Sequence, residues 1–141
     1  MQIPSARDLN PFDDLDGQCA ERHFLGRTVS EAVTLFVEEF SVYCADLFHM
    51  GVIAFKYYIP AAIEYADSDA AKYDCDVAGE LLSLLNHRWH HEYSELGELR
   101  ELFRGYCHSE IGRISNMNFE FHSDCRLERQ FRRYLERLNT N

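Results

Sequence analysis

The sequence predicts an all-α fold, a compact bundle of about five or six helices in which one helix is broken at a proline. Apolar residues recur at steps of three and four in four separate segments, which is the period of one buried helix face. Capping residues precede several of these segments, and polar connections separate them. The 141 residues are 46% hydrophobic and 13% aromatic, which is enough to build one packed core.

The chain is expected to begin with an irregular acidic arm over residues 1–22, followed by a single helical domain over residues 23–141. Two prolines, Gly17 and the run of acidic residues DDLD interrupt any helical period in the arm. The first helix is then signalled by Thr28 and Glu31, which match a capping box at the start of a helix. Its apolar face is made by Val29, Ala32, Val33, Phe36, Phe40, Tyr43 and Leu47. Gly51 is expected to end it in a left-handed cap.

The next segment, residues 52–67, is almost wholly apolar and is expected to be buried on most sides. Pro60 lies in its middle, where a proline removes a backbone donor and clashes with the preceding turn. We therefore expect a short helix that breaks near Ile59, and a new helix that carries Pro60 in its first turn.

Residues 24–28 (FLGRT), Glu31 and Ala32, Met50 and residues 54–65 (AFKYYIPAAIEY) together resemble a family of small uncharacterised bacterial domains. Those domains carry a central aromatic–Tyr-Tyr–aliphatic–Pro-Ala segment of the form FxYY(I/L)PA. The resemblance spans roughly residues 24–67, under a third of the chain, and its motif is hydrophobic. It implies a shared fold and brings no assigned activity and no catalytic residues.

Three more helices are expected in the second half of the chain. Asp74 or Asp76 would cap the first, whose buried stripe is Val77, Leu81, Leu84, Leu85 and Trp89. Ser94 would cap the second, which runs to about Ile114 and contains Gly97, Gly105 and Gly112. These glycines indicate either that the helix breaks near Gly105 or Gly112, or that another group packs closely against their side of it, and the break is favoured. Residues 116–124 would be extended or looped. Ser123 or Asp124 would cap the last helix, with Leu127, Phe131, Tyr134, Leu135 and Leu138 buried.

The net charge of −10 limits the classes of partner. Residues 1–80 hold five Lys/Arg against fifteen Asp/Glu, whereas residues 81–141 hold nine of each. A negative field repels phosphate backbones and anionic lipids, so neither nucleic acid nor membrane binding is expected, and a basic protein partner is favoured. Five cysteines without CxxC spacing and no apolar leader or spanning stretch indicate reduced thiols in a bacterial-type cytoplasm.

Histidines cluster in Asn86–Glu92 (NHRWHHE), where His87 and His91 are four residues apart and share a helix face. Such a pair could hold zinc, but HExxH sites place a glutamate where this chain has Arg88. Further ligands would have to come from the Cys–His neighbours Cys19/His23, Cys107/His108 and His122/Cys125, or from Glu92. None of these spacings is a known structural zinc pattern. The favoured interpretation is the polar edge of a packed helix, so no cofactor is expected.

Two further features could form binding surfaces. Tyr57 and Tyr58, beside Pro60, could line a groove for a partner or could belong to the core, and the core is favoured. The last helix holds five arginines, Arg126, Arg129, Arg132, Arg133 and Arg137. They could dock on the chain's own acidic half, face solvent or bind an external anion, in that order of preference.

No nucleophile elbow, phosphate loop or cysteine-enzyme signature is present, so a non-enzymatic role is favoured. The sequence predicts a small acidic interaction or regulatory protein that binds another protein in an immunity-like or adaptor-like role. A homodimer is one possible assembly. The alternative is a metal-binding enzyme or sensor that uses His87 and His91 with Cys or His ligands from other helices.

Overall fold

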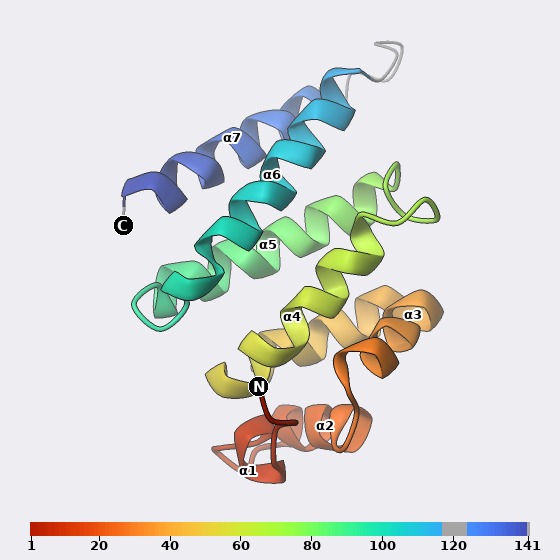
Figure 1. Ribbon diagram of the computed structural model, residues 1–141, viewed down its shortest axis with the longest axis vertical. Coiled ribbons are helices and arrows are strands. Elements are labelled where there is room, and N and C mark those ends of the chain that lie inside the picture. The colour runs from red at the N-terminus through yellow and green to blue at the C-terminus, as the bar shows by residue number, and fades with distance from the viewer. Residues whose placement is uncertain (117–123, 141) are drawn as a thin grey trace. The chain divides into compact units, whose positions relative to one another are not determined.

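The computed structural model describes residues 1–116 and 124–140, and the side chains of residues 1–116 and 126–140. The described residues form seven α-helices and one short 3₁₀ helix, with no strand among them, so the all-α prediction is confirmed (Figure 1). They fall into two compact units, Met1–Tyr65 and Ala66–Asn141.

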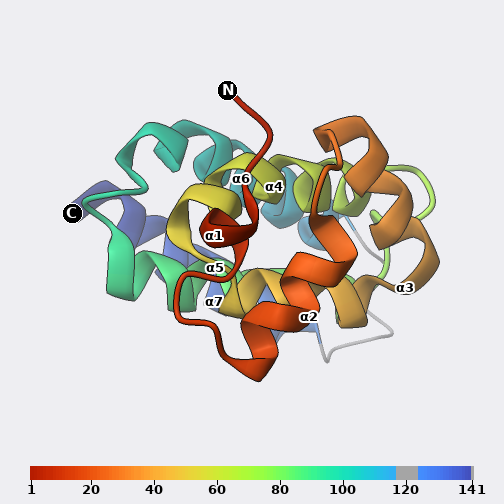
Figure 2. The ribbon, with the colours of Figure 1, turned by 90° about the horizontal axis from the view of Figure 1, so that it is seen from below.

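The first unit begins with two helices where an irregular arm was predicted, and that prediction is wrong. They are α1 (Ala6–Leu9) and α2 (Leu15–Phe24), both labelled in Figure 2. Ser5 and Asp8 form a capping box on α1, and the Asp14 carboxylate accepts a hydrogen bond of 2.7 Å from the Gly17 amide at the start of α2. Acidic residues at these positions satisfy free backbone donors and complement the helix dipole, so they start helices here.

The long helix α3 (Val29–His49) confirms the predicted capping box, with Thr28 and Glu31 bonded to each other's backbone amides. Its one irregularity is at Glu39, where φ −152° and ψ 80° are not helical and the helix kinks. The left-handed cap predicted at Gly51 is wrong, because Met50 ends the helix in an extended conformation.

The break predicted at Pro60 is also absent, and α4 (Val52–Ala66) runs through the proline. Proline removes one helical hydrogen bond and crowds the carbonyl of Lys56, four residues earlier. Ile59 and Ala61 on either side are fully buried. Tertiary packing of an apolar helix contributes more to its stability than local propensity does, so burial on both sides of Pro60 holds the helix together.

The core of the first unit is built around Phe24, which is fully buried at the end of α2. Its ring centroid lies 6.0 Å from that of Phe36 and 4.8 Å from that of Tyr58. The Tyr58 hydroxyl shares its single hydrogen between the carbonyl oxygens of Phe24 and Arg27, at 2.8 and 2.7 Å. The Tyr58 side chain thus joins α4 directly to the end of α2 and to the turn that follows it.

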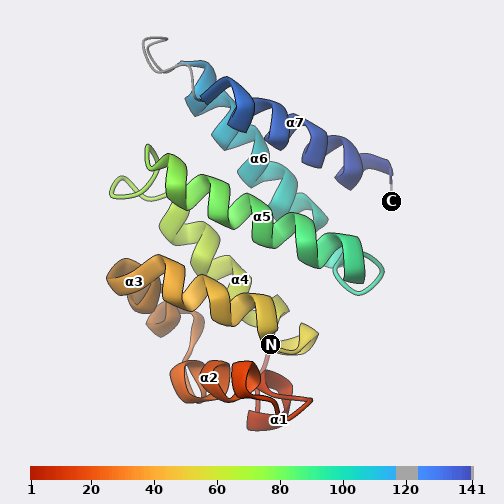
Figure 3. The same cartoon turned by 180° about the vertical axis from the view of Figure 1, so that it is seen from behind.

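The second unit contains α5 (Cys75–Glu92), the 3₁₀ turn η1 (Gly97–Leu99), α6 (Arg100–Ser115) and α7 (Asp124–Thr140). Because the chain reverses twice, α5 and α7 run in the same direction side by side (Figures 1 and 3). Asp74 caps α5 as predicted, through bonds to two backbone amides. The Ser94 cap is wrong, since a turn and η1 intervene before α6.

α6 is continuous, so the favoured break at Gly105 or Gly112 is wrong. Both glycines are exposed, and a Cβ at either would meet no atom of the described residues within 4 Å. The predicted apolar face of α5 is buried, with the rings of Trp89 and Phe103 at a centroid distance of 6.2 Å. On α7, Phe131, Tyr134 and Leu138 are buried as predicted, whereas Leu127 and Leu135 are only half-buried. The loop predicted over residues 116–124 and the caps at Ser123 and Asp124 lie outside the described residues, apart from Asn116 at the end of α6 and the backbone of Asp124 at the start of α7.

We expect Gly51→Ala to destabilise the protein by at least about 1 kcal/mol, because overpacking a closed contact forces the backbone to move. A Cβ at Gly51 would overlap the carbonyl oxygen of Asp8 and lie 3.1 Å from Cγ of Pro11. Gly105→Ala is the matched control and should stabilise the protein by up to about 1 kcal/mol, since its position is helical and open. Urea denaturation of both variants measures the two effects, and equal effects would contradict the prediction.

Candidate functional site

The histidines of Asn86–Glu92 lie on the outside of α5. His87, His90 and His91 are all exposed. The ring centroids of His87 and His91 are 4.7 Å apart, and those of His90 and His91 are 4.9 Å apart. The predicted spacing on one helix face is therefore confirmed, and the three imidazoles form one exposed cluster.

The described residues give this cluster no metal site. Nowhere among them do three His, Cys, Asp or Glu side chains gather in a way that could hold a metal ion. Cys107 is buried, and burial raises the pKa of its thiol to about 12, so it holds its proton. His23, in the other unit, has Nδ1 2.6 Å from Asp46 Oδ2. The side chains of His122 and Cys125 lie outside the described residues.

The remaining residues of this segment are structural. Arg88 is buried, and its Nε lies 2.8 Å from Oε2 of Glu92, one turn later. Trp89 is only 1% exposed, and the Arg100 guanidinium carbon lies 5.4 Å from the centre of its ring. Burial lowers the pKa of Arg88 and raises that of Glu92. Asn86–Glu92 is thus the last part of a packed helix and contains a largely buried ion pair, and the burial of Arg88 had no signal in the sequence.

Tyr57 and Tyr58 do not form an exposed binding surface. Tyr57 is 9% exposed and Tyr58 is fully buried, with ring centroids 4.8 Å apart. Burial raises the pKa of Tyr58 to about 12, which keeps its hydroxyl protonated for the backbone carbonyls that it contacts. The structure places both side chains in the interior, which was the favoured interpretation.

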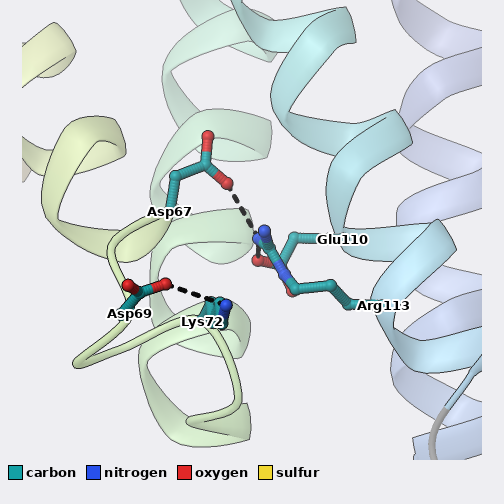
Figure 4. Close-up of polar contacts among 5 residues, drawn as sticks. All are labelled: Asp67, Asp69, Lys72, Glu110 and Arg113. Atoms are coloured by element: carbon teal, nitrogen blue, oxygen red, sulfur yellow. Dashed lines mark hydrogen bonds and ion pairs between the residues drawn. The ribbon is translucent and has the colours of Figure 1, made fainter.

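An ionic cluster in the second unit also has a structural explanation (Figure 4). The Arg113 guanidinium, on α6, contacts Glu110 on its own helix and lies 2.8 Å from Oδ1 of Asp67. Nearby, Lys72 Nζ lies 2.8 Å from Oδ1 of Asp69. Glu110 is only 3% exposed, and a buried carboxylate next to a guanidinium is an expected arrangement for a charge in a core. The cluster fastens the segment before α5 to α6.

One surface feature that packing does not explain is the acidic–apolar segment, residues 12–16 (FDDLD). Phe12 is 83% exposed and Leu15 is 79% exposed, while Asp13, Asp14 and Asp16 between and beside them are exposed as well. Large apolar side chains occur singly on many surfaces. Here two of them bracket a run of carboxylates within five residues.

The backbone holds the acidic–apolar segment in place. Asp13 has a φ of +50°, a left-handed conformation that is uncommon for a residue other than glycine, and its amide lies 3.4 Å from the carbonyl oxygen of Asn10. Asp14 caps α2. Gly17, Ala20 and Phe24 make the buried face of α2, so helical geometry turns Leu15 toward solvent. Asp16 Oδ2 lies 3.7 Å from His49 Nδ1 at the end of α3.

The unit that contains this segment is strongly negative, since residues 1–65 hold four Lys/Arg against ten Asp/Glu. The excess of carboxylates predicted for the first half of the chain thus falls largely on one compact unit. Sequence reasoning missed the exposed Phe12 and Leu15 because it assigned their segment to an irregular arm. The available signal was two large apolar residues within a run of aspartates between Pro11 and Gly17.

Comparison of the chain with models of protein families, with curated proteins and with solved structures finds no match. Within the described residues, none of the helices combines the length and the apolar character that crossing a bilayer requires.

Proposed function

We propose that the protein binds a basic protein partner through the acidic–apolar segment, in an immunity-like or adaptor-like role without catalysis of its own. The observation that carries this proposal is the exposure of Phe12 and Leu15 among Asp13, Asp14 and Asp16 on a unit with a large excess of carboxylates. Membership of the bacterial domain family that residues 24–67 resemble is part of the same proposal.

The apolar side chains supply the affinity. Aromatic and large aliphatic anchors that enter a pocket of the partner carry most of the binding energy of protein interfaces. Phe12 and Leu15 would lose their water-exposed surface only in a complex. Their positive-φ turn and helix cap hold them in one arrangement, which lowers the entropy cost of binding.

The carboxylates supply selectivity and speed of association. A partner with Lys or Arg around an apolar pocket would be attracted from a distance, and acidic partners and nucleic acid would be repelled. Two copies of this chain joined through the segment would bring like charges together. We therefore favour a different protein over a homodimer through this surface.

A reducing cytoplasm is the proposed place of action. The four cysteines whose side chains the structure describes, Cys19, Cys44, Cys75 and Cys107, are free thiols. Disulfides persist mainly in oxidising compartments, so a chain that keeps these residues as thiols suits a reducing one.

Replacement of Phe12 and Leu15 together by serine should weaken binding to the partner at least about tenfold, a loss of about 1.4 kcal/mol or more. The partner is first recovered with the full chain at low salt and identified by mass spectrometry. The two purified proteins are then measured by calorimetry. Binding to the unchanged chain should also weaken as salt is raised, because rim charges are screened.

Val37→Ser with Val42→Ser is the matched control, since both valines are exposed apolar residues of α3 in the same unit. The affinity of this control variant for the partner should stay within about threefold of that of the unchanged chain. Equal loss in both double variants would show that the acidic–apolar segment is not the docking surface. A chain that stays monomeric and recovers no partner at low salt would overturn the proposal as a whole.

A further inference from the structure

A polar groove lies between α5 and α7 in the second unit. Ser83 and Asn86 line it from α5, and Gln130, Arg133 and Arg137 line it from α7. The spacings within each helix are three, four or seven residues, so each set shares one helix face. The two helices are in contact and run in the same direction (Figure 3), and residues from both line the groove.

The groove has the size of a small-molecule site, with a volume of about 410 Å³. The buried side chain of Tyr134 forms part of its wall, with the hydroxyl oxygen 3.4 Å from the carbonyl oxygen of Leu85. Gly79 keeps one end open, since a Cβ there would meet only Leu127 Cδ1, at 3.9 Å. The space is therefore wide enough for a ligand larger than a single ion.

The lining is positive although the chain as a whole is negative. Arg133 and Arg137 are four residues apart on α7 and put two guanidinium groups on the same side of the groove. None of the described residues that line it carries a negative charge. On α7, Glu128 pairs with Arg132 at 2.9 Å, and neither residue lines the groove. Glu136, directly before Arg137, does not line it either.

One of these arginines is oriented by the opposite helix. Arg137 Nη1 donates a hydrogen bond of 2.5 Å to Oδ1 of Asn86, which holds the guanidinium across the groove. The guanidinium keeps further N–H donors, and the Asn86 amide nitrogen is a donor as well. Asn86 is the first residue of the histidine-rich segment, so that segment contributes its asparagine to this groove.

We propose that this groove binds a small phosphorylated molecule, with its phosphoryl group between Arg133 and Arg137 and neutral contacts from Ser83, Asn86 and Gln130. Planar guanidinium groups match phosphate oxygens in pairs, and hydroxyl and amide donors add orientation. The volume leaves room for the rest of the molecule. The net charge of −10 would repel a long polyanion, which extends beyond the groove, more than a compact anion that stays between the two arginines.

Titration of the full chain with pyrophosphate, inorganic phosphate and citrate at low salt tests this proposal. Pyrophosphate should bind with a Kd of about 1 mM or tighter and should shift the Nε–Hε NMR signals of Arg133 and Arg137. Inorganic phosphate should bind the same site more weakly. Citrate is the carboxylate probe, and tighter binding of citrate than of pyrophosphate would overturn the assignment to a phosphoryl group.

Arg133→Gln and Arg137→Gln should each weaken pyrophosphate binding at least about tenfold. Arg126→Gln and Arg129→Gln are the matched controls, since each removes one exposed arginine of α7 that does not line the groove. The controls should change the affinity less than about threefold, because their charges act only through screened solvent. Equal losses in all four variants would show unspecific charge attraction, and no binding at about 10 mM pyrophosphate would show no site; either result overturns the proposal.

Discussion

Phe24→Ala is expected to lower the free energy of unfolding by about 3–5 kcal/mol, the range found when a buried phenylalanine is removed from a packed core. Phe24 is fully buried, and its ring contacts Phe36, Tyr43 and Tyr58 at centroid distances of 4.8–6.1 Å. These neighbours come from α3 and α4, so the cavity would open where all the larger helices of the first unit meet. The surrounding aromatic rings are rigid and would fill little of the cavity, so we expect a loss of unfolding free energy in the upper part of this range.

Urea denaturation measures this effect, with Phe12→Ala as the matched control. Both variants remove the same atoms, but Phe12 is 83% exposed, so its loss should change the free energy of unfolding by less than about 0.5 kcal/mol. Far-UV circular dichroism reports all helices, whereas the fluorescence of Trp89 reports the second unit. A Phe24→Ala variant as stable as Phe12→Ala would contradict the core described above.

The sequence was sufficient wherever local chemistry decides the structure. The Thr28–Glu31 capping box and the Asp74 cap are confirmed, because a side chain that satisfies free amides acts within three residues. The apolar stripe of α5 is confirmed, and that of α7 for three of its five residues, because helical period predicts which positions face the core.

The sequence was insufficient where tertiary packing overrides a local signal. Pro60 is a strong local signal for a break, but α4 continues because its apolar sides are packed on both flanks. The helix that does kink is α3, at Glu39, where the sequence has neither a glycine nor a proline. Residues 1–22 contain two short helices because their acidic residues act as caps, and a 4-residue helix is too short to show a period.

The same division applies to the candidate sites. Spacing predicts that His87 and His91 are neighbours, and they are. Which side chains of other helices approach them depends on packing, which one sequence does not contain. Phe12 and Leu15 became visible as a surface only once α2 showed which of its faces is buried.

Arg88→Met should destabilise the protein by about 3 kcal/mol at neutral pH, because it leaves the Glu92 carboxylate in a largely buried site without its cation. The Arg88 side chain is 7% exposed and that of Glu92 is 25% exposed, so solvent compensates only part of the loss. Methionine fills much of the same space, which separates the loss of charge from the loss of packing. The double variant Arg88→Met/Glu92→Met removes both charges and should be more stable than Arg88→Met alone.

The pH dependence identifies the charge as the cause. Burial already raises the folded-state pKa of Glu92 above its ordinary value of 4.5, and loss of Arg88 should raise it further. A carboxyl with a raised pKa contributes full stability below its unfolded value and loses it as the pH rises through the folded value. The destabilisation by Arg88→Met should therefore be small below about pH 4.5 and grow toward neutrality. A destabilisation that stays constant across this range in Trp89 fluorescence would mean that Arg88 contributes packing alone, with no ion pair of consequence.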